Sequence, residues 1–115
     1  MKYLLGLGSN LGNPEKNIRR AIAALEKRSV KISTSFSLYR TEAVGFVDQP
    51  WFLNQVVETE ADLTPYELLQ AAKDIETTMG RRPSPRNARR IIDIDILMAE
   101  NAVIRTGDLV VPPPN

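Results

Sequence analysis

The sequence contains no cysteine and no histidine among its 115 residues. Without cysteine there is no disulfide, no thiolate zinc site and no cysteine nucleophile, which fits the reducing cytoplasm. Without histidine, no imidazole acts as a general base or a metal ligand. Any catalysis by this chain must therefore use carboxylates, arginine, lysine, hydroxyl groups or a bound metal ion.

Long hydrophobic runs are also missing. The N-terminal stretch 1–6 is too short in apolar residues for a signal peptide, and no later stretch approaches the roughly 20 apolar residues that span a bilayer. A net charge of +1 is no general signature of nucleic-acid binding. We therefore expect one soluble, cytoplasmic domain over residues 1–115, with no membrane or nucleic-acid partner.

The most informative pattern is a pair of carboxylates, Asp93 and Asp95, inside the apolar segment 90–97. If the segment is a strand, both carboxylates point to one face. Two neighbouring charges among isoleucines are costly unless a divalent metal ion or a basic partner neutralises them, and hard oxygen ligands suit Mg²⁺. The alternative is that the aspartates face solvent or pair with arginines for structural reasons.

An arginine-rich segment, residues 80–90, comes directly before this pair. Gly80, Pro83 and Pro85 disfavour regular structure there. The segment carries five arginines, Arg81, Arg82, Arg86, Arg89 and Arg90. Taken alone, they could form a solvated patch or a non-specific nucleic-acid contact. Next to a metal-binding carboxylate pair, however, arginines that bind phosphate oxygens indicate a nucleoside triphosphate site.

Local signals predict four strands and two helices. The helices begin after the N-caps Asn13 and Thr64, each followed by proline at the first helical position, and they run to about residues 28 and 79. The strands are expected at 2–7, 30–39, 51–60 and in the segment that contains Asp93. This order predicts an α+β, ferredoxin-like βαββαβ sandwich, an antiparallel sheet with two helices on one face. An RNA-binding module of this fold would need exposed aromatic residues on its central strands, and the fourth strand has isoleucine and aspartate instead.

Several ordered motifs resemble those of the 6-hydroxymethyl-7,8-dihydropterin pyrophosphokinase family of folate biosynthesis. They are Gly8-Ser9-Asn10-Leu11-Gly12, Tyr39-Arg40-Thr41, Asp48-Gln49-Pro50-Trp51-Phe52-Leu53-Asn54, Met79-Gly80-Arg81 and the segment from Arg90 to Leu97. The resemblance implies a kinase-type transferase that moves the β,γ-pyrophosphoryl unit of ATP to the hydroxymethyl oxygen of the pterin and releases AMP.

The resemblance also implies roles for individual residues. Asp93 and Asp95 would hold two Mg²⁺ ions and, with Arg81 and Arg90, would be the catalytic group. The implied ATP-binding residues are Glu76, Arg82, Arg86, Arg90 and Ile96, and the implied pterin-binding residues are Thr41, Val44, Phe52 and Asn54. An asparagine amide suits the hydrogen-bonding edge of a pteridine, and a phenylalanine suits its flat face.

Structural alternatives stand beside these roles. Phe52 could be a core aromatic, Asn54 a turn former and Glu76 a solvent-exposed helix carboxylate. The Gly8-Ser9-Asn10 turn is expected to be structural, without a part in catalysis.

The chain departs from the family at its C-terminal end. Family members continue past the Val-Pro motif, so the resemblance implies that a strand and a helix are lacking here, together with one wall of the pterin site. Pro113 stands where the family has histidine, and Asn87-Ala88-Arg89 replaces a Trp-Gly-Pro sequence. A truncated or non-catalytic nucleotide- or pterin-binding domain is therefore the alternative function, and a sheet edge left open by truncation would favour self-association.

Overall fold

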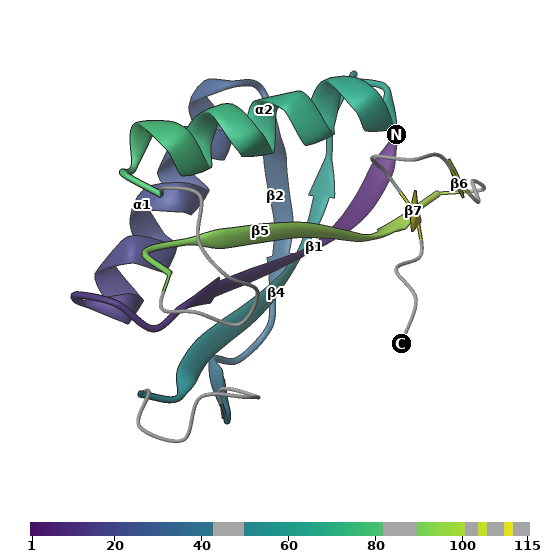
Figure 1. Cartoon of the computed structure of the whole chain (residues 1–115). Helices are drawn as coiled ribbons and strands as arrows, with labels where there is room; N and C mark the ends of the chain where they lie inside the picture. The colour runs from purple at the N-terminus through teal and green to yellow at the C-terminus, as the bar shows by residue number, and fades with distance from the viewer. Residues whose placement is uncertain (43–49, 82–89, 101–103, 106–109, 112–115) are drawn as a thin grey trace.

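The described part of the chain contains an antiparallel sheet with two helices across one face, and a separate two-stranded sheet (Figure 1). The computed structural model describes residues 1–42, 50–81, 90–100, 104–105 and 110–111. The elements are β1 (Lys2–Ser9), α1 (Pro14–Lys27), β2 (Lys31–Ser35), β3 (Tyr39–Thr41), β4 (Phe52–Glu60), α2 (Pro65–Thr78), β5 (Asp93–Ala99), β6 (Ile104–Arg105) and β7 (Val110–Val111). None of the helices described is long and apolar enough to cross a bilayer.

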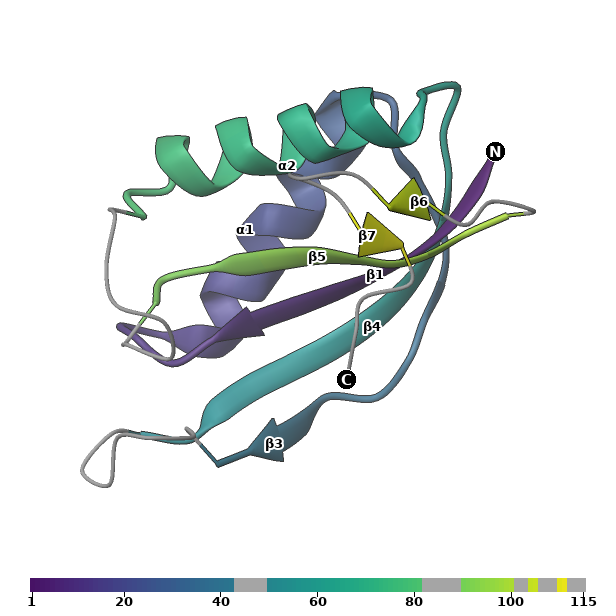
Figure 2. The same ribbon diagram turned by 45° about the vertical axis from the view of Figure 1, so that its right-hand side comes forward.

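The order of the strands is that of a ferredoxin-like sandwich, which confirms the predicted fold class. The sheet runs β2-β4-β1-β5, with β3 also paired to β4, and every pairing is antiparallel. Figure 2 shows β5, β1, β4 and β3 side by side. β1 and β4 are therefore central, and β5 lies beside β1 with its carboxylates next to the glycines of that strand. Gly6 and Gly8 are opposite Asp95 and Asp93 in the register.

The single strand predicted over residues 30–39 is wrong in one respect, because two strands occupy this region. β2 pairs with the end of β4, from Val57 to Glu60, whereas β3 pairs with its start, from Phe52 to Asn54. Between them the Gln55 side chain donates a hydrogen bond to the Phe36 carbonyl at 2.8 Å. A side chain thus replaces part of the backbone ladder where the chain passes from one strand to the next.

Both helices begin as the capping signals predict. The Asn13 side chain accepts a hydrogen bond from the Lys16 N–H, and Thr64 forms a reciprocal capping box with Glu67. α2 ends in a Schellman motif, in which the Arg81 N–H donates to the Glu76 carbonyl and the Gly80 N–H donates to that of Thr77. Gly80 has a φ of +98°, which glycine adopts without steric cost.

The core lies between the sheet and the helices. Along β1 the side chains of Tyr3, Leu5 and Leu7 are buried, and they alternate with residues that point to the other face. They pack with apolar residues of α1, α2, β4 and β5, among them Ile18, Leu25, Leu68, Ile75, Val57, Ile94 and Ile96. Because the helices cover only this face, the opposite face is left to Gly6, Gly8, Asn54, Asp93 and Asp95.

Candidate active site

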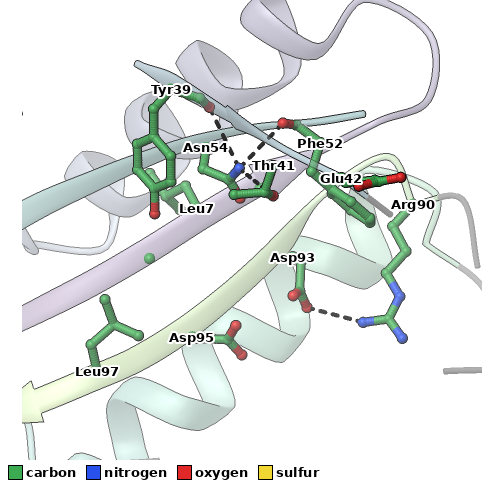
Figure 3. A pocket seen from close by; sticks show the side chains of 12 residues that line it. Leu7, Tyr39, Thr41, Glu42, Phe52, Asn54, Arg90, Asp93, Asp95 and Leu97 are labelled. Carbon is green, nitrogen blue, oxygen red and sulfur yellow. Dashed lines mark hydrogen bonds and ion pairs between the residues drawn. The ribbon is translucent and has the colours of Figure 1, made fainter. Parts of the chain in front are cut away.

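A cavity of about 300 Å³ lies on the sheet face opposite the helices (Figure 3). Strands β1, β3, β4 and β5 supply its lining residues, which are Gly6, Leu7, Gly8, Tyr39, Thr41, Glu42, Phe52, Asn54, Arg90, Asp93, Asp95 and Leu97. The cavity therefore combines a polar amide and a hydroxyl, aromatic rings from two strands, and the carboxylate pair.

The Asn54 side chain is held by hydrogen bonds to β3 and to its own strand. Its Nδ2 atom donates to Thr41 Oγ1 at 2.9 Å and to the Phe52 carbonyl at 3.2 Å. A Cβ atom on Gly8 would lie 3.1 Å from Asn54 Oδ1, so the glycine makes room for the amide. Since Nδ2 is used within the protein, the amide oxygen is the atom that remains for the donors of a ligand.

The two carboxylates of β5 are on the open face, as strand alternation predicts. Asp93 is already paired with arginine, because its Oδ1 atom lies 2.8 Å from Arg81 Nη1 and 3.4 Å from Arg90 Nη1. The basic partner considered from the sequence is therefore present at Asp93, whereas Asp95 forms no ion pair with an arginine among the described residues. The acidic pair is only partly compensated.

This incomplete compensation changes the titration of Asp95. Loss of hydration, together with the negative charges of Asp93 and Glu76 and against the opposing charge of Arg81, raises the pKa of the Asp95 carboxyl to about 6. A carboxylate with this pKa is in an environment that favours an added positive charge.

Glu76, on α2, connects the helix to the acidic strand. Its Oε2 atom accepts a hydrogen bond from the Ile94 N–H at 2.8 Å and pairs with Arg81 Nη1 at 2.6 Å. Burial raises the pKa of the Glu76 carboxyl, the Ile94 N–H and Arg81 act against this rise, and Asp93 adds to it. Glu76 thereby holds the backbone between the two aspartates, so it is not a solvent-exposed helix carboxylate.

Arg90 has a buried donor that finds no acceptor. Its side chain is only 16% exposed, and its Nε atom lacks a hydrogen-bond partner within the described structure. A buried unpaired donor is costly, and more so on a cation. An anion bound beside Asp93 would satisfy it.

A second cavity, of about 450 Å³, lies on the α2 side of the acidic strand. Its lining residues are Leu69, Lys73, Glu76, Arg81, Arg90, Asp93, Ile94 and Asp95. It shares Arg90, Asp93 and Asp95 with the first cavity. The carboxylate pair therefore lies where an aromatic, amide-bearing cavity meets a basic one.

The described residues include no group of three or more acidic, histidine or cysteine side chains that could hold a metal ion. Mg²⁺, however, is commonly bound by one or two carboxylates together with substrate phosphates. Asp93 and Asp95, with the raised pKa of Asp95, fit that mode of binding.

The structure brings most of the predicted site residues together. Thr41, Phe52 and Asn54 line the first cavity, Glu76 and Arg81 line the second, and Arg90, Asp93 and Asp95 line both. Ile96 is different, because its side chain is 5% exposed in the core and lines neither cavity. Val44, Arg82 and Arg86 lie outside the described residues.

Other lining residues were not predicted from the sequence to be site residues. Tyr39 and Thr41 have one residue between them on β3, so alternation along that strand could have indicated Tyr39. Leu69 and Lys73 are one helical turn apart on α2, and Lys73 is one turn before Glu76, so helical periodicity could have indicated them. Leu97 follows Asp95 on the same face of β5.

Comparison with known proteins adds independent evidence. The chain is 40% identical over 111 residues to a 2-amino-4-hydroxy-6-hydroxymethyldihydropteridine pyrophosphokinase of Bacillus subtilis (strain 168), covering 96% of this chain and 66% of the relative. It is 42% identical over 110 residues to the enzyme of that name from Aquifex aeolicus (strain VF5), covering 96% and 68%. It is 39% identical over 111 residues to the mitochondrial folate synthesis bifunctional protein of Pisum sativum, covering 96% and 22%.

The chain thus spans about two thirds of the length of the two pyrophosphokinases and about a fifth of the bifunctional protein. A family comparison covers residues 4–115, which include every residue of the two cavities. On this match the chain belongs to the 7,8-dihydro-6-hydroxymethylpterin-pyrophosphokinase (HPPK) family.

Proposed function

We propose that this chain transfers the β,γ-pyrophosphoryl unit of ATP to the hydroxymethyl oxygen of 6-hydroxymethyl-7,8-dihydropterin. The observation that carries the proposal is the meeting of two chemically different cavities at Arg90, Asp93 and Asp95. A two-substrate transfer needs its acceptor and donor sites to meet at the reacting atoms. The names of the relatives, which are pyrophosphokinases of a hydroxymethyldihydropteridine, support this choice of reaction.

The pterin would occupy the first cavity. The Asn54 amide oxygen would accept hydrogen bonds from the N–H donors of the pteridine, and Phe52 would offer an aromatic surface for its flat ring. Thr41, which already accepts a hydrogen bond from Asn54, would hold that amide in its orientation. Val44 stays a predicted contact.

The triphosphate would occupy the second cavity, where Arg81 and Arg90 supply donors for phosphate oxygens. The unpaired Nε atom of Arg90 supports this placement. Glu76 lines the same cavity, Arg82 and Arg86 stay predicted contacts, and Ile96, buried on the core side, would reach ATP only through its backbone.

In the reaction, the pterin hydroxyl oxygen forms a bond to the β-phosphorus of ATP, and the bond from that phosphorus to the α,β-bridging oxygen breaks. AMP leaves with the bridging oxygen, and the hydroxyl proton is released to water. The nucleophile belongs to the substrate, so the protein needs no covalent residue. Arg81 and Arg90 would stabilise the charge on the transferred group, and Asn54 would orient the acceptor.

Two Mg²⁺ ions form part of this proposal, with Asp93 and Asp95 as the residues that would hold them. When bound, the metal ions neutralise phosphate charge and bring the triphosphate and the acceptor together. Arg81 and Arg90, which pair with Asp93 in the structure, would exchange this carboxylate for the phosphates. A cytoplasmic location also remains part of the proposal.

The decisive experiment measures AMP release from ATP and Mg²⁺, with and without the pterin, for the wild-type chain and for Asp93→Asn. We expect pterin-dependent AMP from the wild type and its loss in the variant. Ser33→Ala, which changes an exposed residue on β2 away from both cavities, is the control and should keep the activity.

The alternative function considered from the sequence, binding of pterin or nucleotide without turnover, would use the same two cavities. Calorimetric titration with the pterin distinguishes the two functions. Pterin binding without AMP release from a folded chain would establish the binding function and refute the proposed transfer.

A further inference from the structure

Asn10, in the turn after β1, is expected from the sequence to be structural only, but its contacts join three distant parts of the chain. It is 2% exposed. Its backbone N–H donates to the Arg90 carbonyl at 3.0 Å, and its Oδ1 atom accepts from the Arg90 N–H at 2.7 Å. Its Nδ2 atom donates to the Pro50 carbonyl at 3.2 Å. One buried residue thus binds the backbone just before β4 and just before β5.

These contacts fix the orientation of the Asn10 amide. The Arg90 N–H can only donate and the Pro50 carbonyl can only accept, so the oxygen must face Arg90 and the nitrogen must face Pro50. Aspartate in its charged form would offer no donor to Pro50, and alanine would offer neither group. The side chain is therefore matched to both partners.

The turn that carries Asn10 is itself held from α1. Asn17 Nδ2 donates to Ser9 Oγ at 3.2 Å and to the Leu11 carbonyl at 2.8 Å, so α1 binds the residues on both sides of Asn10. Ser9 is fully buried and Asn17 is 7% exposed. Asn10 thus projects from a turn that is tied to a helix.

Arg90 needs such support because it lies outside the sheet. The last residue pair between β1 and β5 is Gly8 with Asp93, three residues after Arg90. Asn10 supplies two hydrogen bonds to the Arg90 backbone there, one from its own backbone N–H and one to its side-chain oxygen. Arg90 lines both cavities and has a buried, unpaired Nε atom, so a small shift of its backbone would move a charged group at the centre of the site.

We propose that Asn10 is a positioning residue that fixes the backbone of Arg90, and through it the guanidinium that meets the transferred phosphoryl group. Asn10 lines neither cavity, so it acts through Arg90. The effect of Asn10 on the reaction rate rests on the proposed function. The restraint of the Arg90 backbone by Asn10 does not.

The first test compares the steady-state kinetics of Asn10→Ala with those of the wild type. We expect kcat to fall about 10- to 100-fold while KM for the pterin changes little, because displacement of a catalytic group by about 1 Å can cost this much. Thr59→Val is the matched control. It removes another buried hydrogen bond, from Thr59 Oγ1 to the Tyr3 carbonyl, at a residue outside both cavities, and should keep kcat.

A double-variant cycle tests whether Asn10 acts through Arg90. In an Arg90→Ala background, Asn10→Ala should cause little further loss of kcat, since the group that it positions is already gone. Equal losses in the two backgrounds would overturn the proposal, as would a kcat for Asn10→Ala that equals that of Thr59→Val.

Hydrogen exchange of the backbone amides tests the restraint of Arg90 by Asn10 in the absence of substrate. We expect the Arg90 N–H to exchange about 10-fold faster or more in Asn10→Ala, but to stay protected in Thr59→Val. Asn10→Asp keeps the oxygen that accepts from Arg90, so it should preserve this protection and lose less kcat than Asn10→Ala. Unchanged Arg90 exchange in a folded Asn10→Ala protein refutes the proposal. A wild type that releases no AMP refutes the proposed function instead.

Discussion

Asp95 shows how a site residue can weaken the protein that carries it. Its pKa is raised to about 6 by lost hydration and by the charges of Asp93 and Glu76, above its ordinary value of 3.8. The folded state therefore binds a proton between about pH 4 and pH 6 that the unfolded state has already lost. The stability associated with Asp95 is fully present below pH 4 and is lost as the pH rises through 6.

Removal of the Asp95 charge should therefore stabilise the folded protein at neutral pH. Without metal ion at pH 7, Asp95→Asn should be more stable than the wild type by about 1 kcal/mol, a figure that allows for solvent screening at an open carboxylate. The gain should vanish near pH 4, where the wild-type carboxyl is protonated. Urea denaturation at both pH values measures it, and a variant less stable than the wild type at pH 7 would contradict the prediction.

Glu76 offers a second test at the residue scale, because its hydrogen bond and its charge can be separated. Glu76→Gln keeps an oxygen for the Ile94 N–H, whereas Glu76→Ala leaves that donor unpaired. Since burial raises the pKa of the carboxyl, the protein gains little from its charge. We expect a loss of about 1 kcal/mol for glutamine and about 3 kcal/mol for alanine.

Thermal and urea unfolding of the two Glu76 variants make the comparison. Equal losses would mean that the charge, and not the hydrogen bond to Ile94, is what stabilises the protein at this residue.

At the scale of elements, the end of α2 determines where Arg81 lies. Gly80 has a φ of +98°, which closes the Schellman motif and turns Arg81 back toward Glu76. Alanine in this conformation costs roughly 1–2 kcal/mol, whereas asparagine tolerates it better. The preference for glycine at the end of α2 therefore determines where the Arg81 guanidinium lies.

The third prediction uses this difference. Gly80→Ala should lower the free energy of unfolding by about 1 kcal/mol and weaken binding of ATP, because Arg81 is displaced, and Gly80→Asn should lose less of both. Thermal denaturation and calorimetric titration measure the two effects. If Ala and Asn variants behave alike, the left-handed conformation of Gly80 is not what places Arg81.

The same scale shows what could be predicted from the sequence. The caps Asn13 and Thr64, the closing Gly80 and the alternation through Asp93 and Asp95 are local signals, and they fix the elements and the shared face of the carboxylates. The hydrogen bond from Ile94 to Glu76 spans 18 residues, and that from Arg90 to Asn10 spans 80. Such contacts depend on how the elements pack, so no local pattern could indicate them.

For the molecule as a whole, a single sheet face organises both candidate substrate sites. The helices bury one face, and the opposite one brings the amide and aromatic groups of β3 and β4 to the carboxylates of β5. The arginines that line the second cavity contact the same strand. The two sites therefore share their charged centre but differ in how much of their binding energy should depend on metal ions.

The fourth prediction separates the two sites through ligand-induced stability. In the presence of Mg²⁺, both the pterin and α,β-methylene-ATP, whose α,β bridge resists cleavage, should raise Tm on the order of 10 °C at about 100 times Kd. Removal of divalent ions with EDTA should abolish the shift caused by the nucleotide, because Asp93 and Asp95 would then repel its phosphates. The shift caused by the pterin should largely persist, since Asn54, Thr41 and Phe52 carry no charge.

Asn54→Ala is the reciprocal variant for this experiment. It removes the amide of the first cavity and leaves the residues of the second unchanged, so it should lose the pterin shift and keep the Mg²⁺-dependent nucleotide shift. A nucleotide shift that survives EDTA would show that the arginines alone bind the triphosphate, and the assignment of Asp93 and Asp95 as metal ligands would then fail. A pterin shift that disappears with the metal ion would instead place the acceptor against the carboxylates, so that the two sites could not be separated by charge.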